Sequence, residues 1–217
     1  MNFDDISIEW IMHDCFKFKA SKVIYIDPFQ VPDGLETADY ILVSHEHFDH
    51  CNPEAISKLA DENTTIITIK ACEEKLQDLN FKEIIIVAPN NSYDFDGFSL
   101  ETIPAYNTHR FRSPDVPFHP KESGMVGFVL HLGGKRIYHS GDVDKIPEMG
   151  DLKNIDIALV PVSGKYVMDA KEAVEAIKLI NPKIAIPMHY GTDIVGTIDD
   201  AKEFKELVGD FCRVEIL

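Results

Sequence analysis

The sequence predicts an α/β protein with two β-sheets and helices packed outside them. Three observations support this fold class. Short runs rich in valine and isoleucine recur along the chain, helical segments fall between some of them, and polar side chains follow several of the predicted strands. At 217 residues the chain is long enough to bury one substantial core, and no internal repeat is visible in it. We therefore expect a single domain over residues 1–217.

The predicted strands share a short length and a high content of β-branched residues, which is typical of strands. They are Ile6–Met12, Val23–Asp27, Tyr40–Ser44, Thr65–Ile69, Ile84–Ala88, Phe98–Pro104, Val126–His131, Arg136–Ser140, Ile155–Pro161, Ile184–Pro187 and Arg213–Leu217.

Four helices are expected between these strands. The first begins at Asn52-Pro53, and the second covers about Ala71–Leu79. The third follows Asp169 and ends at Asn181-Pro182, and the fourth runs from about Ile198 to Val208. The helix after Asp169 has the clearest pattern, because Asp169 is a favoured N-cap residue and Glu172 stands at the capping-box position. The segment from about Asn107 to Gly124 has weak periodicity and is predicted to be a long loop.

Composition limits the function classes. The formal net charge of −16 repels phosphate backbones, so we expect no nucleic-acid substrate. The four cysteines have irregular spacing without a C-x-x-C pair, which is typical of a reducing compartment. No apolar run approaches the roughly 20 residues of a membrane span, and acidic residues follow Met1 where a signal peptide needs basic ones. We expect a cytoplasmic protein that acts on a small molecule without a membrane; no feature indicates an oligomeric state.

A cluster of metal-ligand residue types follows the strand at 40–44. His45, His47, Asp49 and His50 lie within six residues of one another. In extended backbone His45 and His47 project to the same side and can bind one ion. The adjacent Asp49 and His50 diverge and can serve a second ion. Two divalent ions about 3.5–4 Å apart could share a water molecule and make it nucleophilic near neutral pH.

Other predicted strands also end in polar residues. Asp142 follows Ser140-Gly141, and His189 follows Pro187-Met188. If these strand ends share one sheet edge, their side chains converge, and Asp142 could bridge two ions through its two oxygens. Asp27 follows Ile26 and has two interpretations: it orients a ligand histidine from behind, or it is a turn carboxylate before Pro28.

The ordered motifs resemble the metallo-β-lactamase superfamily over about residues 6–212. The resemblance is carried by His45-x-His47-x-Asp49-His50, then Gly141-Asp142, then His189. It implies a four-layer αβ/βα sandwich of two mixed β-sheets, with helices on the outer faces and a binuclear metal site at the sandwich edge. Finer segments, among them His13-x-Cys15-Phe16 and Ile26–Phe29, resemble the small single-domain branch that includes ascorbate-6-phosphate lactonase.

One position departs from the family pattern. The family usually supplies a third histidine to the first ion just after the strand at 98–104, where this chain has Ala105-Tyr106-Asn107. We favour His119 as the replacement, with Asn107, His109 or an open, water-filled position as alternatives. The resulting set of expected metal ligands is His45, His47, Asp49, His50, His119, Asp142 and His189. Asp49 is also the expected catalytic residue, because it could orient the nucleophile or take its proton.

The remaining histidines have structural interpretations: His139 as a buried strand residue, His13 as part of the pocket rim and His131 as an ordinary strand histidine. For an anionic substrate the nearby positive charges are Lys121, Lys165 and Arg110, of which Lys165 is preferred because it lies in a loop after a strand.

The predicted function is hydrolysis, by metal-bound hydroxide, of a small ester, lactone or phosphoester, including anionic ones. Two divalent ions are expected. Zinc is preferred, with Mn, Fe or Ni as alternatives, since His and Asp ligands suit several first-row metals. An iron-dependent redox enzyme on the same scaffold and a non-catalytic metabolite-binding protein are the alternative functions.

Overall fold

The computed structural model describes residues 1–3 and 5–217, and these form two compact units, residues 1–88 and 89–217. Each unit contains a mixed seven-stranded sheet and two α-helices within the described residues. The predicted α/β class with two mixed sheets is therefore confirmed. That the whole chain is one domain stays a prediction.

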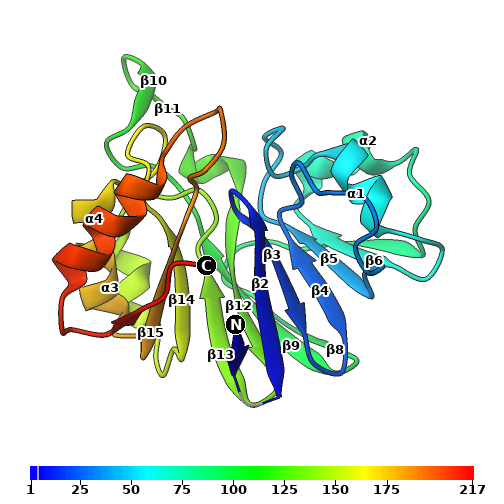
Figure 1. Ribbon diagram of the computed structural model, residues 1–217. Coiled ribbons are helices and arrows are strands. Elements are labelled where there is room, and N and C mark those ends of the chain that lie inside the picture. Colours follow the sequence, from blue (N-terminus) through cyan, green and yellow to red (C-terminus); the bar gives the residue numbers. More distant parts are fainter. Residues whose placement is uncertain (4) are drawn as a thin grey trace. The chain divides into compact units, whose positions relative to one another are not determined.

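The sheet of the first unit follows chain order. Its strands are β1 (Asn2–Phe3), β2 (Ile6–Met12), β3 (Cys15–Lys19), β4 (Val23–Ile26), β5 (Tyr40–Val43), β6 (Thr65–Thr68) and β7 (Glu83–Ile86). Neighbours are antiparallel from β1 to β4 and parallel from β4 to β7. The helices α1 (Pro53–Leu59) and α2 (Glu73–Leu76) lie together near β5 and β6 (Figure 1).

The burial of the central strands agrees with their parallel pairing. Every residue of β4 and β6 is buried, as expected for parallel strands covered on both faces. Because β4 and β5 run parallel, their carboxyl ends meet at one edge of the sheet. Asp27 follows β4 at that edge, and Ser44-His45 follow β5.

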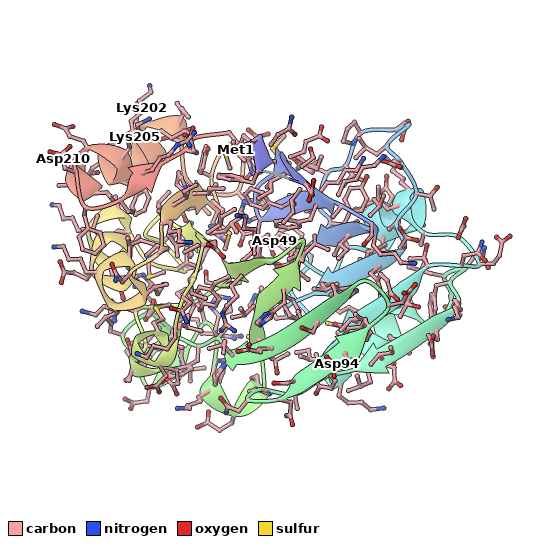
Figure 2. All side chains as sticks on the ribbon, turned by 90° about the horizontal axis from the view of Figure 1, so that it is seen from below. Met1, Asp49, Asp94, Lys202, Lys205 and Asp210 are labelled. Atoms are coloured by element: carbon pink, nitrogen blue, oxygen red, sulfur yellow. The ribbon has the colours of Figure 1, made fainter. Side chains whose placement is uncertain are left out.

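The sheet of the second unit has the order β8, β9, β12, β13, β14, β15 and β16. The strands are β8 (Ser92–Phe95), β9 (Phe98–Pro104), β12 (Val126–Leu132), β13 (Lys135–His139), β14 (Ile157–Pro161), β15 (Ile184–Met188) and β16 (Arg213–Val214). The helices α3 (Ala170–Ile180) and α4 (Ile198–Val208) pack against each other and against β14 and β15, respectively (Figure 1). Lys202 and Lys205 extend from the exposed side of α4, and Asp210 lies just beyond its end (Figure 2).

All the predicted strands are present, with ends within three residues of the prediction, but the described residues contain others. These are β1, β3, β8 and the hairpin of β10 (Phe111–Ser113) and β11 (Val116–Pro117). The prediction of a long loop at 107–124 is therefore wrong in part, because the hairpin projects from the sheet of its unit and a 3-10 turn follows at Lys121–Ser123 (Figure 1). The hairpin strands are short and largely exposed, so no hydrophobic alternation marked them.

Helix ends agree well with the capping residues. Asn52 accepts a hydrogen bond from Ala55 N–H at the start of α1, and Asp169 accepts one from Glu172 N–H at the start of α3. The predicted capping box at Glu172 is wrong in one respect. Its carboxylate accepts the Lys145 N–H at 2.8 Å and pairs with Arg110, instead of turning back to Asp169. The helix predicted at 71–79 is shorter, because only 73–76 are α-helical.

Candidate metal centre

The first unit holds four of the expected ligands in the loop after β5. His45, Asp49 and His50 are buried, and His47 is half-buried. The His45 ring lies 4.7 Å from the His47 ring and 4.0 Å from the His50 ring, centroid to centroid. Asp49 Oδ2 lies 4.0 Å from His50 Nε2. The loop therefore gathers all four side chains closely, including Asp49 and His50, which were expected to diverge from each other.

Asp27 anchors this loop from the end of β4. Its Oδ1 accepts the Ser44 N–H at 2.7 Å, and its Oδ2 accepts the Ser44 hydroxyl at 2.6 Å. The same Oδ2 lies 2.9 Å from His50 Nδ1. Asp27 and its partners Ser44 and His50 are buried. The geometry supports the first interpretation of Asp27, as a residue that orients ligand histidines, over that of a simple turn carboxylate.

These hydrogen bonds fix the histidine tautomers. A carboxylate can only accept, so His50 Nδ1 carries a proton toward Asp27. Because the Ser44 hydroxyl donates to Asp27, it must accept from His45 Nδ1, which lies 2.9 Å away. In both neutral rings the lone pair is then on Nε2. Metal-binding histidines commonly use this arrangement, in which the second ring nitrogen is held by a carboxylate or hydroxyl.

His13 also belongs to this cluster, and sequence reasoning underestimated it. It is buried directly after β2, with a positive φ of 57°, and its Nε2 lies 3.3 Å from Asp49 Oδ2. Ligand atoms of His13, Asp49 and His50 lie within 4.8 Å of one another. The signal was present in the sequence: His13 follows an apolar strand, the same pattern that singled out Asp27 and His189.

In the second unit Asp142 lies between two histidines. Its Oδ2 is 3.2 Å from His119 Nε2, and its Oδ1 is 3.4 Å from His189 Nε2. All three residues are buried. Ligands at 2.0–2.1 Å from a tetrahedral ion are separated by roughly 3.3 Å, so these spacings suit ligands that share an ion. The structure thus brings together the three expected ligands of this unit.

Asn107 supports His119 from behind. Its Nδ2 lies 3.0 Å from Asp144 Oδ1 and 2.9 Å from the Tyr166 carbonyl, both of which can only accept. The amide orientation is therefore settled, and Oδ1 faces His119. That oxygen accepts the His119 backbone N–H at 2.8 Å and lies 2.8 Å from its Nδ1. His119 Nδ1 must carry a proton, which places the lone pair of the neutral ring on Nε2, toward Asp142.

His189 occupies a tight backbone position after β15. Its φ is +62°, and its Nδ1 lies 2.8 Å from the Ser163 hydroxyl, which follows the parallel neighbour β14. Gly196 packs against both residues. A Cβ atom there would lie 2.7 Å from the His189 carbonyl oxygen and 2.7 Å from Ser163 Cβ. Gly196 therefore keeps the space that this histidine needs.

His109 lies apart from Asp142, beside Asp144 and Glu172. Its side chain is 57% exposed, and its ring nitrogens lie 3.3 and 3.4 Å from these two carboxylates. Arg110 occupies the same group, 2.5 Å from each carboxylate. Burial raises the pKa of Asp144, but the His109 backbone N–H and the Arg110 guanidinium outweigh it and hold the pKa below its usual range. Arg110 is thus committed to internal ion pairs, and the expectation that it serves an anionic substrate is not supported.

The other predicted side chains have clear places. His139 is buried on β13 as expected, and its Nδ1 accepts the Gly141 N–H at 3.3 Å. His131 on β12 pairs with Glu101 and Arg136, as expected of a structural histidine. Lys121 pairs with Glu148 at 2.8 Å, and Lys165 lies over the Tyr166 ring.

The buried histidine and aspartate side chains of each unit have the chemistry of a cation site. At His119 and Asp142, the Nε2 lone pair of the neutral ring faces a carboxylate oxygen at 3.2 Å, and two acceptors at this distance repel each other unless a cation or a second ring proton lies between them. Buried histidine and aspartate donors suit divalent first-row metals.

No helix within the described residues is long and apolar enough to cross a membrane.

Comparison with known proteins places the chain in a family. A family model described as Beta-lactamase superfamily domain matches residues 7–189. The chain is 33% identical to a UPF0173 metal-dependent hydrolase of Thermoplasma acidophilum, over 95% of this chain and 92% of the relative. A crystal structure of a metal-dependent hydrolase from Parabacteroides distasonis is 32% identical, with a TM-score of 0.83 over 97% of this chain and 92% of that one.

A zinc-dependent hydrolase of the metallo-β-lactamase superfamily from Thermotoga maritima is 25% identical, with a TM-score of 0.64 over 97% of each chain. These alignments confirm the predicted fold class. With the matched family model and the curated relatives, they show that this chain belongs to the metallo-β-lactamase superfamily and, within it, to the UPF0173 metal-dependent hydrolases.

Proposed function

We propose that this metal-dependent hydrolase uses two divalent ions, zinc by preference, to cleave a small ester, lactone or phosphoester. The observation that carries the proposal is the fixed tautomer of three buried histidines. His50, His45 and His119 each direct Nδ1–H to a protein acceptor, which puts a lone pair on Nε2. Metal-binding histidines commonly have this arrangement, and here it occurs three times.

The proposed ligands are the seven expected from the sequence. They are His45, His47, Asp49 and His50 of the first unit, with His119, Asp142 and His189 of the second. When bound, the ions would lower the pKa of a coordinated water and polarise the substrate oxygen. Asp142 presents its two oxygens to two different histidines, as a carboxylate that bridges two ions would do.

Asp49 is proposed to orient the nucleophile or take its proton. It is 8% exposed, and its Oδ2 lies near both His13 and His50. His13 Nε2, at 3.3 Å, holds the carboxylate in place.

His119 is proposed as the replacement for the family's third histidine, in preference to Asn107. The Asn107 oxygen already accepts two hydrogen bonds from His119, so it is used in orienting that residue. An amide oxygen is also a weaker zinc donor than imidazole nitrogen. His109 is disfavoured because it is exposed and paired with Asp144 and Glu172.

Zinc and a small substrate are the preferred choices. The relative from Thermotoga maritima is described as zinc-dependent, and the His/Asp donor set suits zinc as well as Mn, Fe or Ni. The net charge of −16 disfavours nucleic acid as substrate. Among the lysines considered for an anionic group, Lys165 is favoured over Lys121, whose charge is paired with Glu148. These features agree with a reaction like that of the ascorbate-6-phosphate lactonase branch.

The test is a hydrolysis panel of phosphodiester, lactone and thioester substrates, assayed with zinc-loaded protein. The matched variants are His45→Ala, a proposed ligand, and His131→Ala, a strand histidine paired with Glu101. We expect turnover of at least one class, lost in His45→Ala and kept in His131→Ala. No turnover of any class by the parent, or equal turnover in both variants, would contradict the proposal.

A further inference from the structure

The segment that leads to His119 is tied to helix α3 by an ion-pair network. Arg110 Nη1 lies 2.5 Å from Asp144 Oδ1 and 2.5 Å from Glu172 Oε2. Its Nε donates to the Gly164 carbonyl at 3.3 Å. The Arg110 side chain is only 10% exposed, and that of Glu172 is 13% exposed. Solvent therefore screens these interactions little, and removal of one partner leaves a charge without compensation.

Asp144 connects this ion-pair network to residues 107–109 by hydrogen bonds. Its Oδ2 accepts the backbone N–H of Thr108 at 2.7 Å and that of His109 at 3.0 Å. Its Oδ1 accepts from Asn107 Nδ2 at 3.0 Å. Asp144 is fully buried, and a buried carboxylate is retained only when donors and a positive charge surround it. Arg110 supplies that charge.

The network ends on a proposed metal ligand. Asn107, fixed by Asp144 and by the Tyr166 carbonyl, holds both the backbone N–H and the ring Nδ1 of His119. The Asn107 N–H in turn donates to the His119 carbonyl at 2.8 Å, so the two residues close the base of the β10–β11 hairpin. The order of contacts is Glu172, Arg110, Asp144, Asn107 and His119.

We propose that Arg110 is a positioning residue for the metal ligand His119, acting through Asp144 and Asn107. The inference rests on the proposed function, because it takes His119 as a ligand. The group formed by His109, Asp144 and Glu172 has the spacing of a cation site, with ligand atoms within 4.8 Å of one another. The guanidinium of Arg110 is the cation of that group. A planar, permanently charged guanidinium can pair two carboxylates at once and so holds Asp144 in one orientation.

The experiment compares zinc affinity, measured by competition with a chromophoric chelator, in Arg110→Met, Arg110→Lys and the parent. We expect zinc binding in Arg110→Met to weaken by up to about tenfold, the lower end of the range found when partners of metal ligands are removed. Arg110→Lys keeps the charge but cannot pair both carboxylates as well, so its affinity falls between the two. With cobalt in place of zinc, the visible spectrum of Arg110→Met should change as the coordination of His119 loosens.

Arg136→Met is the matched control, because Arg136 also pairs with a carboxylate and a histidine in the same unit. It should lose stability without loss of zinc affinity. If Arg110→Met does not fold, Glu172→Gln removes one side of the pair and should weaken zinc binding several-fold.

The results distinguish an error in the proposed ligand set from an error in the positioning role of Arg110. His119→Ala with unchanged zinc affinity would overturn the proposed ligand set. If His119→Ala binds zinc weakly but folded Arg110→Met or Glu172→Gln stays within twofold of the parent, the positioning role of Arg110 is wrong. An equal loss in Arg136→Met would also overturn it, because the effect would then follow from general destabilisation.

Discussion

The two units of the molecule pair their strands in the same way. In each sheet three antiparallel neighbours are followed by three parallel ones, from β1 to β7 in the first unit and from β8 to β16, without the β10–β11 hairpin, in the second. In each, a carboxylate follows the first strand of the parallel set. Asp27 follows β4, and Asp142 follows β13.

The units differ in how they hold their histidines. In the first, one loop carries all the proposed ligands, and the buried charge of Asp27 orients two of them. In the second, the proposed ligands come from three separate segments, and the neutral groups of Asn107 and Ser163 support the histidines. Carboxylates at corresponding strand ends therefore have different roles: Asp27 orients proposed ligand histidines of the first unit, whereas Asp142 faces those of the second unit directly. A charged anchor should therefore matter more for metal affinity than a neutral one.

The largest effect is expected from Asp27→Asn, which keeps the shape of the side chain but replaces an acceptor by an N–H donor. If the amide NH2 faces His50, that ring must accept at Nδ1 and carry its proton on Nε2, where it opposes metal binding. If the amide oxygen faces His50, the NH2 group opposes the Ser44 N–H and the loop loses its anchor. We expect zinc affinity to fall by about a hundredfold, the upper end for such partners. Chelator competition measures this, with circular dichroism as the check on folding. Affinity within twofold of the parent in a folded variant would refute the anchoring role.

A smaller effect is expected from Asn107→Ala. The variant removes a neutral acceptor that holds a single histidine, and hydrogen bonds without an ionised partner are the weaker kind. Zinc affinity should fall by about tenfold in the same assay. A larger loss of zinc affinity in Asn107→Ala than in Asp27→Asn would contradict the expectation that the charged anchor matters more than the neutral one.

Gly196→Ala should weaken zinc binding only several-fold while it destabilises the fold. The new Cβ would meet the His189 carbonyl and Ser163, and the φ of +77° adds strain. Gly134→Ala is the control, because its φ of +73° imposes similar strain but nothing lies within 4 Å of the new atom. Urea unfolding and chelator competition should show a stability loss in both variants, and an affinity loss in Gly196→Ala alone. An equal affinity in the two variants would argue against contact with His189.

The smallest effect is expected away from the proposed ligands, at Arg136. Burial raises the pKa of Glu101, but hydrogen bonds from Arg136 and His131 outweigh it and lower the pKa. A lowered pKa in the folded state stabilises the protein above the unfolded value of the carboxyl, and this contribution is lost as the pH falls through the folded value. Arg136→Met should lower the free energy of unfolding by up to about 1 kcal/mol at pH 7 and by less at pH 3. Urea unfolding of the parent and the variant at both pH values measures this difference. An equal cost at the two pH values would show that this ion pair contributes nothing.

The fold class and most strands could be predicted because short β-branched runs mark strands whatever their partners are. The clustering of His45, His47, Asp49 and His50 could be predicted because they are close in sequence, and their role as metal ligands stays a prediction. The anchoring by Asp27 could not, since it depends on the parallel pairing of β4 with β5, which brings Asp27 beside Ser44.

The second unit was harder to predict for the same reason. Asn107 and His119 are twelve residues apart, and only the closed base of the hairpin reveals that one orients the other. His13 was underestimated because its partner Asp49 is 36 residues away. The shared strand order of the two units is a property of backbone pairing, so it left no repeat in the sequence.

Elemental analysis of metal per chain in untagged protein, in His50→Ala and in His119→Ala tests most directly whether both units supply metal ligands. Each variant removes a proposed ligand from a different unit. We predict near two ions per chain in the parent and a clear decrease in both variants. About one ion in the parent and in His119→Ala, with loss only in His50→Ala, would contradict the claim that both units supply metal ligands.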